Sequence, residues 1–461
     1  MTLRSFLLGL TTGAVAFAGT LYWTADVMVV FGDLPRPLAV PVSLLLVAYL
    51  SLYPATAAMC VATWMRRWGP AALWTAPAAW VALEYGRGTW LTGFPWVLLG
   101  YSQATVLPVA QLASVFGVYG VSALVVLVNA ALARAALRTT PRRWLGPLAA
   151  VGLVAAVAVW GQARIASGRL ARDGQPLRVG IAQGNVLQGQ KWDPAFAGRI
   201  LHTYLQMTRQ LAGQGAALVV WPESATPFFF EEEPAGRQAM VDVARETGTW
   251  LLFGSDQVER ASPPRFYNSA FLVAPDGRQV GAYRKMQLVP FGEYVPLRKL
   301  LFFVAPLVES VADFHPGTDQ TLLPIDGRPI STAICYEAVF PALARSAVAH
   351  GSQLLTTVTN DAWYGRSSAP YQHFEQASLR AVEQGRYLVR AANTGISGIV
   401  DPYGRVLARS ALFEPATLSG EVRLLEVRTV YSRIGDALVW ASFAICAWIA
   451  LATILQARRR S

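Results

Sequence analysis

The chain has 461 residues, of which 54% are hydrophobic and 15% charged, and its mean hydropathy of +0.36 departs from ordinary soluble domains in the direction of membrane proteins. Its net charge of +11 is concentrated in residues 1–170, which contain eleven arginines and three acidic residues among apolar segments. This distribution favours a role of the arginines in membrane orientation over nucleic-acid binding. Three cysteines and four scattered histidines exclude a disulfide-stapled scaffold and show no zinc-type spacing.

Six apolar stretches are long enough to cross a bilayer, which takes about 20 residues. They lie at about 5–25, 38–63, 71–90, 108–133, 145–162 and 437–456. The first follows Arg4 and resembles a signal peptide, but it has no small-residue cleavage site followed by polar sequence, so we expect an uncleaved helix. The sequence therefore predicts about five transmembrane helices in residues 1–165, one more at 437–456, and a basic cytoplasmic tail at 457–461.

The arginines predict the orientation of these helices. With six spans, one side of the membrane receives Arg4, Arg66, Arg67, Arg134, Arg138, Arg142, Arg143, Arg458, Arg459 and Arg460. The short loops on the opposite side carry Arg36 and Arg87 together with the three acidic residues. Because basic loops stay in the cytoplasm, we expect both termini there and the large polar segment on the outer, periplasmic side.

That polar segment, residues 175–430, alternates short β-rich runs with helix-compatible stretches, which indicates an α/β domain. The expected strands are 177–183, 217–221, 250–254, 268–273, 330–334 and 354–359. The expected helices are about 195–213, 235–247, 341–350 and 372–386.

Three ionisable residues follow expected strands of this domain: Glu223, Lys285 and Cys335. Each has an ordinary explanation, and a lone cysteine is most often a small buried hydrophobe. Together they form a coherent set, because a carboxylate can take a thiol proton and an ammonium can stabilise both the thiolate and an oxyanion. This chemistry needs no histidine, and His373 lies in an expected helix with no partner signature.

Three sequence blocks, 221–223, 284–285 and 335–337, resemble the Glu–Lys–Cys triad blocks of the nitrilase superfamily in the expected order. Further blocks resemble the apolipoprotein N-acyltransferase family within it. These blocks are 91–96, 183–185, 191–194, 288–296, 360–365 and 393–398. The resemblance covers nearly the whole chain, although the six expected spans are two fewer than is usual in that family.

The resemblance implies a transmembrane helix bundle joined to a nitrilase-like domain built as a four-layer α-β-β-α sandwich. It also implies a two-step acyl transfer in the bacterial inner membrane. Cys335 would take an acyl chain from a phospholipid, namely phosphatidylethanolamine, as a thioester. The α-amine of the N-terminal diacylglyceryl-cysteine of a lipoprotein would then accept the chain as an amide. Glu223 would be the general base and Lys285 the charge stabiliser, with no cofactor and no metal, in a monomer that binds no nucleic acid.

Four further residues match functional positions of the family. The resemblance implies that Glu293 orients Lys285, that Glu337 holds the loop after Cys335, and that the aromatic residues Trp192 and Tyr336 shape a lipid pocket. Since the backbone N–H of Tyr336 directly follows the nucleophile, it is also the expected oxyanion donor. Two apolar loop segments, 228–230 and 300–304, are expected to flank the entrance for acyl chains, because such segments are costly in water and stable at a bilayer surface.

Two alternatives remain open from the residues alone. The same triad would serve a membrane-tethered amidase that hydrolyses a small amide. The other alternative is a non-catalytic receptor or transporter. Transporters tend to carry charged residues within their spans, whereas here Glu84 is the one acidic residue in mid-chain apolar sequence.

Overall fold

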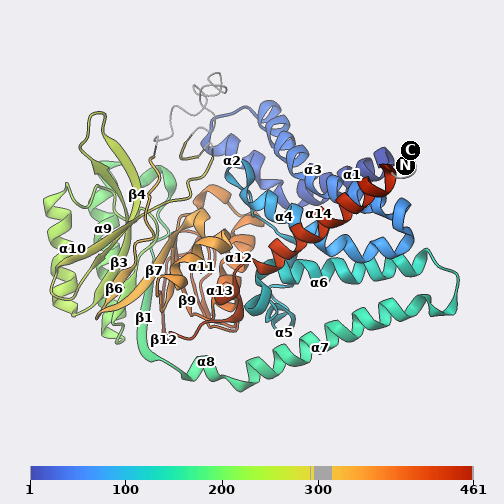
Figure 1. Ribbon diagram of the computed structural model, residues 1–461. Coiled ribbons are helices and arrows are strands. Elements are labelled where there is room, and N and C mark those ends of the chain that lie inside the picture. Colours follow the sequence, from blue (N-terminus) through green and yellow to red (C-terminus); the bar gives the residue numbers. More distant parts are fainter. Residues whose placement is uncertain (1, 291, 295–313, 459–461) are drawn as a thin grey trace. The chain divides into compact units, whose positions relative to one another are not determined.

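The computed structural model describes residues 2–290, 292–294 and 314–458 and divides into two compact units (Figure 1). One unit combines the helices up to Ser167 with the C-terminal segment from Thr429. The other is formed chiefly by Gly168–Arg428. The first therefore contains all the long apolar stretches and the second contains the polar segment of the sequence.

The helical unit is built from long apolar helices joined by short turns. Its helices are α1 (Thr2–Leu21), α2 (Trp23–Phe31), α3 (Arg36–Trp68), α4 (Ala76–Thr89), α5 (Leu107–Ala110), α6 (Ala113–Ala136), α7 (Leu145–Ser167), α13 (Val430–Ile434) and α14 (Ala437–Arg458). Within the described residues, five stretches are long and apolar enough to cross a membrane: Thr2–Leu21, Arg36–Thr92, Ala113–Ala136, Arg142–Arg172 and Ala437–Leu455.

The stretch Arg36–Thr92 contains two of the six expected spans. It has 57 residues, far more than the roughly 20 that one crossing needs. The chain breaks at Gly69, whose φ of +68° lies in the left-handed region that glycine tolerates, and α3 and α4 pack against each other on either side of this break. Helix α3 has 33 residues and is long enough to cross a bilayer, whereas α4 has 14, so the six spans stay a prediction.

Helices α1 and α3 approach closely through two glycines spaced four residues apart. A Cβ atom at Gly9 would lie 2.7 Å from the Cα of Ala55, and one at Gly13 would lie 2.9 Å from the Cα of Ser51. Small residues at this spacing let two helix backbones meet in a membrane, where packing drives association in place of the hydrophobic effect. Gly9 and Gly13 therefore set the contact between α1 and α3.

The second unit contains two six-stranded sheets, each with parallel strands at its centre. The first runs in the order β12 (Ala416–Leu424), β1 (Gln175–Gln183), β2 (Leu218–Val220), β3 (Trp250–Glu259), β4 (Arg265–Val273) and β5 (Gln279–Arg284). The second runs in the order β11 (Val406–Arg409), β10 (Gly398–Val400), β9 (Leu388–Ala392), β8 (Leu355–Thr359), β7 (Arg328–Ile334) and β6 (Leu323–Ile325). Strands β1 to β3 pair in parallel, as do β7 to β9, so their carboxyl ends point the same way within each sheet.

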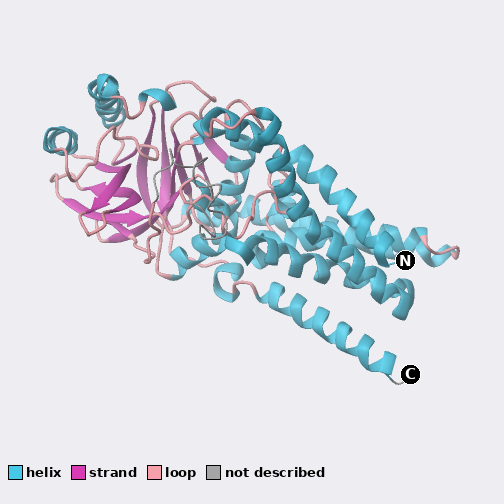
Figure 2. Ribbon diagram, turned by 90° about the horizontal axis from the view of Figure 1, so that it is seen from above, coloured by secondary structure: helices cyan, strands magenta, loops and turns pink. Residues whose placement is uncertain are grey.

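The two sheets face each other, and helices cover their outer faces. Strand β1 contacts β9 and β4 contacts β7, while α9 (Pro194–Gly213) and α10 (Pro234–Thr247) lie on the first sheet. Helices α11 (Pro341–Ala349) and α12 (Ala369–Gln384) lie on the second. Figure 2 shows the strands of this unit gathered between helices. The arrangement is the α-β-β-α sandwich that the resemblance implies.

Candidate active site

Glu223 is carried by the loop that follows β2, the central strand of the first sheet. The loop passes so close to β3 that a Cβ atom at Gly254 would lie 2.6 Å from the Cα of Glu223. Ser224 adopts a φ of +42°, a left-handed conformation that is costly for a residue other than glycine. The absence of a side chain at Gly254 and the turn at Ser224 together direct the Glu223 carboxylate into the interior, where the residue is buried.

Lys285 lies directly after β5 and forms a buried ion pair with two carboxylates. Its Nζ atom is 2.7 Å from Oε1 of Glu293 and 3.4 Å from Oε1 of Glu223. Asn268 on β4 donates to both carboxylates, at 2.7 Å to Glu223 and 3.0 Å to Glu293. Burial alone would lower the pKa of Lys285, but Glu293 and then Glu223 outweigh burial and hold that pKa above its usual range. The lysine is therefore cationic.

Two further donors fix the position of Glu223. The backbone N–H of Asn360 donates to its Oε2 atom at 2.8 Å, and the Nζ of Lys191 donates to its backbone carbonyl at 3.0 Å. Lys191 is buried, and burial lowers its pKa. The base candidate is thus held by both sheets, because Asn360 follows β8 of the second sheet.

Cys335 directly follows β7, the strand next to β8 in the second sheet, and its φ of +52° is left-handed. Burial, followed by the negative charge of Glu223, raises the pKa of the thiol to about 12, while Lys285 opposes this rise. The resting group is consequently a neutral thiol that needs a base.

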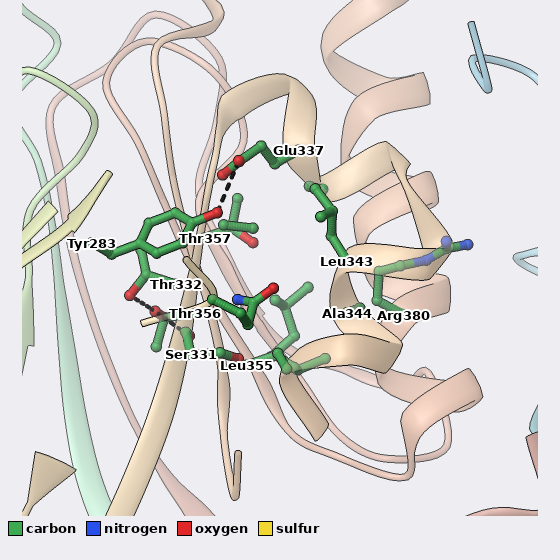
Figure 3. Close-up of a pocket in the computed structure, with 15 residues that line it drawn as sticks. Tyr283, Ser331, Thr332, Glu337, Leu343, Ala344, Leu355, Thr356, Thr357 and Arg380 are labelled. Atoms are coloured by element: carbon green, nitrogen blue, oxygen red, sulfur yellow. Dashed lines mark hydrogen bonds between the residues drawn. The ribbon is translucent and has the colours of Figure 1, made fainter. Parts of the chain in front are cut away.

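Glu337 ties the segment that carries Lys285 to the strand that carries Cys335. Its Oε1 atom accepts from the backbone N–H groups of Met286 at 2.7 Å and Gln287 at 3.1 Å, and from the hydroxyl of Tyr283 at 2.8 Å. Its Oε2 atom accepts from the backbone N–H of Ile334 at 2.7 Å. Figure 3 shows the hydroxyl of Tyr283 directed at this carboxylate. Burial raises the pKa of Glu337.

A small cavity lies beside Glu337, between the second sheet and helices α11 and α12 (Figure 3). Its volume of about 30 Å³ accommodates water but no acyl chain. Glu337 and Tyr283 line it, together with Ser331, Thr356 and Arg380 among others. The cavity therefore lies behind the Glu337 anchor and is not a substrate pocket.

The aromatic candidates occupy different environments. Tyr336 is buried, whereas Trp192 is 44% exposed and its ring lies 6.1 Å from that of Phe229. Within the segment 228–230, the expectation of an exposed acyl entrance is wrong for Phe230, which is completely buried in the core between the first sheet and its helices. Phe228 packs against the same core. The segment 300–304 lies outside the described residues.

His373, for which the sequence shows no partner signature, has three polar partners in the structure. Its Nε2 atom lies 3.0 Å from the backbone oxygen of Cys335, and its Nδ1 atom lies 2.9 Å from Oδ1 of Asp361 and 3.0 Å from Nη2 of Arg390. The sequence gives no local signal for this cluster, because its members come from α12, β9 and the loop after β8. Within the described residues, no group of three or more His, Cys, Asp or Glu side chains is arranged to hold a metal ion.

Comparisons with known proteins match both parts of the chain to family models. A family model described as carbon-nitrogen hydrolase matches residues 178–431, and one described as apolipoprotein N-acyltransferase N-terminal domain matches residues 1–131. Among solved structures, the amidase from Nesterenkonia sp. is similar to this chain with a TM-score of 0.44 and 24% sequence identity. The match covers 59% of this chain and 97% of the amidase. A likeness at that level carries no argument about function.

Curated relatives match almost the full length of the chain. The apolipoprotein N-acyltransferase of Geobacter metallireducens is 42% identical over 465 residues, covering 99% of this chain and 88% of the relative. That of Methylococcus capsulatus is 37% identical over 467 residues, with the same coverage of both chains. The chain therefore belongs to the apolipoprotein N-acyltransferase family, within the carbon-nitrogen hydrolase (nitrilase) superfamily.

Proposed function

We propose that this protein transfers an acyl chain from a phospholipid to the N-terminal α-amine of a diacylglyceryl-modified lipoprotein, through a thioester on Cys335. The observation that carries the proposal is the buried contact of Lys285 with the carboxylates of Glu223 and Glu293 in the domain where Cys335 follows β7. Such a set supplies a nucleophile, a base and a cation in a site shielded from water. Family membership supports the choice of substrates.

In the first step Glu223 takes the thiol proton and the Cys335 sulfur attacks the ester carbonyl carbon of the phospholipid. The new C–S bond creates an oxyanion, which the cation of Lys285 and the backbone N–H of Tyr336 stabilise. The ester C–O bond then breaks, and the proton held by Glu223 passes to the departing lysophospholipid oxygen. A base is required because the resting thiol, with its pKa raised to about 12, carries almost no negative charge at neutral pH.

In the second step the lipoprotein amine attacks the thioester carbonyl. Glu223 takes a proton from the attacking nitrogen, the C–S bond breaks, and the proton returns to the Cys335 sulfur as the amide forms. Because donor and acceptor use the same site in turn, one lipid-lined entrance can serve both. The Trp192 and Phe229 pair is our candidate for part of that entrance, since Trp192 is half-exposed and the two rings are adjacent.

We propose phosphatidylethanolamine as the donor, a monomeric enzyme in the bacterial inner membrane, and a periplasmic catalytic domain with both termini in the cytoplasm. The arginine distribution supports the orientation. A maleimide that cannot cross membranes should label a cysteine that replaces the exposed residue Glu414 in intact spheroplasts. A cysteine that replaces the exposed residue Thr139 should be labelled only after the spheroplasts are lysed. The reverse pattern would overturn the orientation.

The two-step mechanism predicts that donor and acceptor can be supplied separately. The protein in detergent micelles is incubated with phosphatidylethanolamine labelled in its acyl chain, freed of unbound lipid, and then mixed with a synthetic peptide that begins with S-diacylglyceryl-cysteine. Label should appear on the peptide amine. Transfer that needs both substrates together contradicts the thioester route, and release of the label as free fatty acid at the same rate without peptide supports the hydrolase alternative.

A further inference from the structure

The short segment between β1 and α9, residues 184–191, makes hydrogen bonds to residues of both sheets, and we call it the strap. It bonds to Asn393 and Asn360, which directly follow β9 and β8 of the second sheet. It also bonds to Glu223, which follows β2 of the first sheet. Asn393 and Asn360 are only 1% and 3% exposed. The strap therefore joins buried polar groups of the two sheets.

Asn393 fixes the first part of the strap. Its backbone oxygen accepts from the N–H of Asn185 at 3.0 Å. Its Oδ1 atom accepts from the backbone N–H of Val186 at 2.9 Å, and its Nδ2 atom donates to the backbone oxygen of Val186 at 2.8 Å. A backbone N–H can only donate and a carbonyl oxygen can only accept. Val186 therefore determines which end of the Asn393 amide is oxygen and which is nitrogen.

This direction passes on to Asn360. The Nδ2 atom of Asn393 also donates to Oδ1 of Asn360 at 3.1 Å. The oxygen of the Asn360 amide therefore faces Asn393, and its Nδ2 atom donates to Oε1 of Gln188 in the strap at 2.7 Å. The two asparagines form a ladder of amides whose hydrogen bonds all run in one direction and whose two ends bind the strap, at Val186 and at Gln188.

The ladder and the strap both reach Glu223. The backbone N–H of Asn360 donates to Oε2 of Glu223 at 2.8 Å. At the end of the strap, the Nζ atom of Lys191 donates to the backbone oxygen of Glu223 at 3.0 Å, and Lys191 is 4% exposed. That oxygen belongs to the peptide that leads to Ser224, whose φ of +42° is costly. Glu223 is thus held at its carboxylate by Asn360 and at its peptide by the strap.

We propose that Asn393, Asn360 and Lys191 are positioning residues, which set the place of the Glu223 carboxylate through the strap. The inference deepens the proposed function and rests on it, because it takes Glu223 as the general base. A general base must lie within hydrogen-bonding reach of the proton that it takes, so a small displacement of the carboxylate lowers the rate. The proton transfer itself stays between Cys335 and Glu223.

Gln188 offers the cleanest test, because it is half-buried and its substitution leaves the core intact. Gln188→Leu removes the acceptor for Asn360. Gln190→Leu is the matched control, since Gln190 is half-buried in the same strap and its side chain makes no hydrogen bond within the described part of the chain. Single-turnover labelling from phosphatidylethanolamine should be at least about fivefold slower in Gln188→Leu than in Gln190→Leu.

Two further measurements separate a positioning role from a merely structural one. Alkylation of Cys335 by iodoacetamide, in a Cys60→Ser/Cys446→Ser background, needs no general base and should differ by less than about twofold between the two leucine variants. In a Glu223→Gln background, Gln188→Leu should cause no further slowing of acylation, because the base through which the ladder acts is absent. If Gln188→Leu does not fold, Lys191→Met is compared with Gln190→Leu in the presence and absence of Glu223.

Equal acylation rates in Gln188→Leu and Gln190→Leu would overturn the inference. So would the same fold-loss in the presence and absence of Glu223, or an equal loss of alkylation, because the defect would then lie outside the base. Failure of the unaltered protein to form any thioester would refute the proposed function and the inference together. A normal thioester in the unaltered protein with equal rates in the two variants would refute the inference alone.

Discussion

The ammonium of Lys285 lies 2.7 Å from Glu293 and 3.4 Å from Glu223, so its nearer carboxylate partner is not the residue that we assign as the base. Both carboxylates also accept from the amide of Asn268. The closer contact with Glu293 therefore holds the ammonium in place beside Glu223.

We therefore expect Glu293→Gln to slow acyl-enzyme formation about tenfold or more, because Lys285 would lose its closer carboxylate partner and the ammonium would no longer be held in its position beside Glu223. Single-turnover labelling from phosphatidylethanolamine measures the rate. Glu414→Gln, which neutralises an exposed carboxylate, serves as the matched control and should have no effect. A Glu293→Gln variant that acylates as fast as this control contradicts the division of roles between the two carboxylates.

Glu223→Gln should change thiol acidity and catalysis in opposite directions. The negative charge of Glu223 raises the pKa of the Cys335 thiol, so its removal lowers that pKa and increases the thiolate fraction at a given pH below it. Alkylation by iodoacetamide should accelerate, whereas acyl-enzyme formation should fall by a factor of at least about 100 for want of a general base. In the unaltered protein, alkylation should rise about tenfold per pH unit below the thiol pKa of about 12. A decrease of both rates in Glu223→Gln is the result that would refute this electrostatic account.

Glu337→Gln should disable the site more severely than Tyr283→Phe. The Glu337 carboxylate accepts four hydrogen bonds, three of them from backbone N–H groups that flank Lys285 and Cys335. An amide group replaces one acceptor oxygen by a donor and leaves buried N–H groups unsatisfied, at about 1–3 kcal/mol. Tyr283→Phe removes one of the four bonds, at about 1 kcal/mol. Melting temperature and acylation rate measure both effects, and equal losses in the two variants would argue against the anchoring role of Glu337.

Substitution by serine should have different effects on stability and activity at Phe229 and at Phe230. Phe230 is buried in the core, so Phe230→Ser should reduce the free energy of unfolding by roughly 3–5 kcal/mol. Phe229 is only half-buried and lies beside the half-exposed Trp192, so Phe229→Ser should leave the melting temperature nearly unchanged and slow acylation from phospholipid. A soluble short-chain ester is the control substrate, and an equal slowing with that ester would contradict a role at the lipid entrance.

The sequence predicted the strands whose residues form continuous apolar runs and missed the others. Strands β1, β2, β3, β4, β7 and β8 lie where the sequence places them, because they form the buried centre of each sheet. Strand β12 (Ala416–Leu424) was missed because it is an edge strand with a largely half-exposed, polar sequence. Strand β9 (Leu388–Ala392) contains Arg390, which looks out of place in a core strand until its ion pair with Asp361 is seen.

The site was predictable to the extent that its residues follow apolar strands. Glu223 and Lys285 do so, and the structure places the Lys285 ammonium 3.4 Å from Oε1 of Glu223. Asn268 and His373 were missed because nothing in their local sequence marks them. Asn268 is 45 residues from Glu223, and His373 is 38 residues from Cys335. Their contacts arise from the pairing of strands and the packing of a helix, which a single sequence does not reveal.

The thioester on Cys335 is tested by the mass of the protein after brief exposure to phosphatidylethanolamine. The protein should gain the mass of one acyl chain, located on the peptide that contains Cys335 and released by neutral hydroxylamine, as a thioester requires. Cys335→Ala should show no gain, while Cys60→Ser and Cys446→Ser should acylate normally. An acyl group found elsewhere in the chain, or one that persists in Cys335→Ala, would contradict a thioester on Cys335.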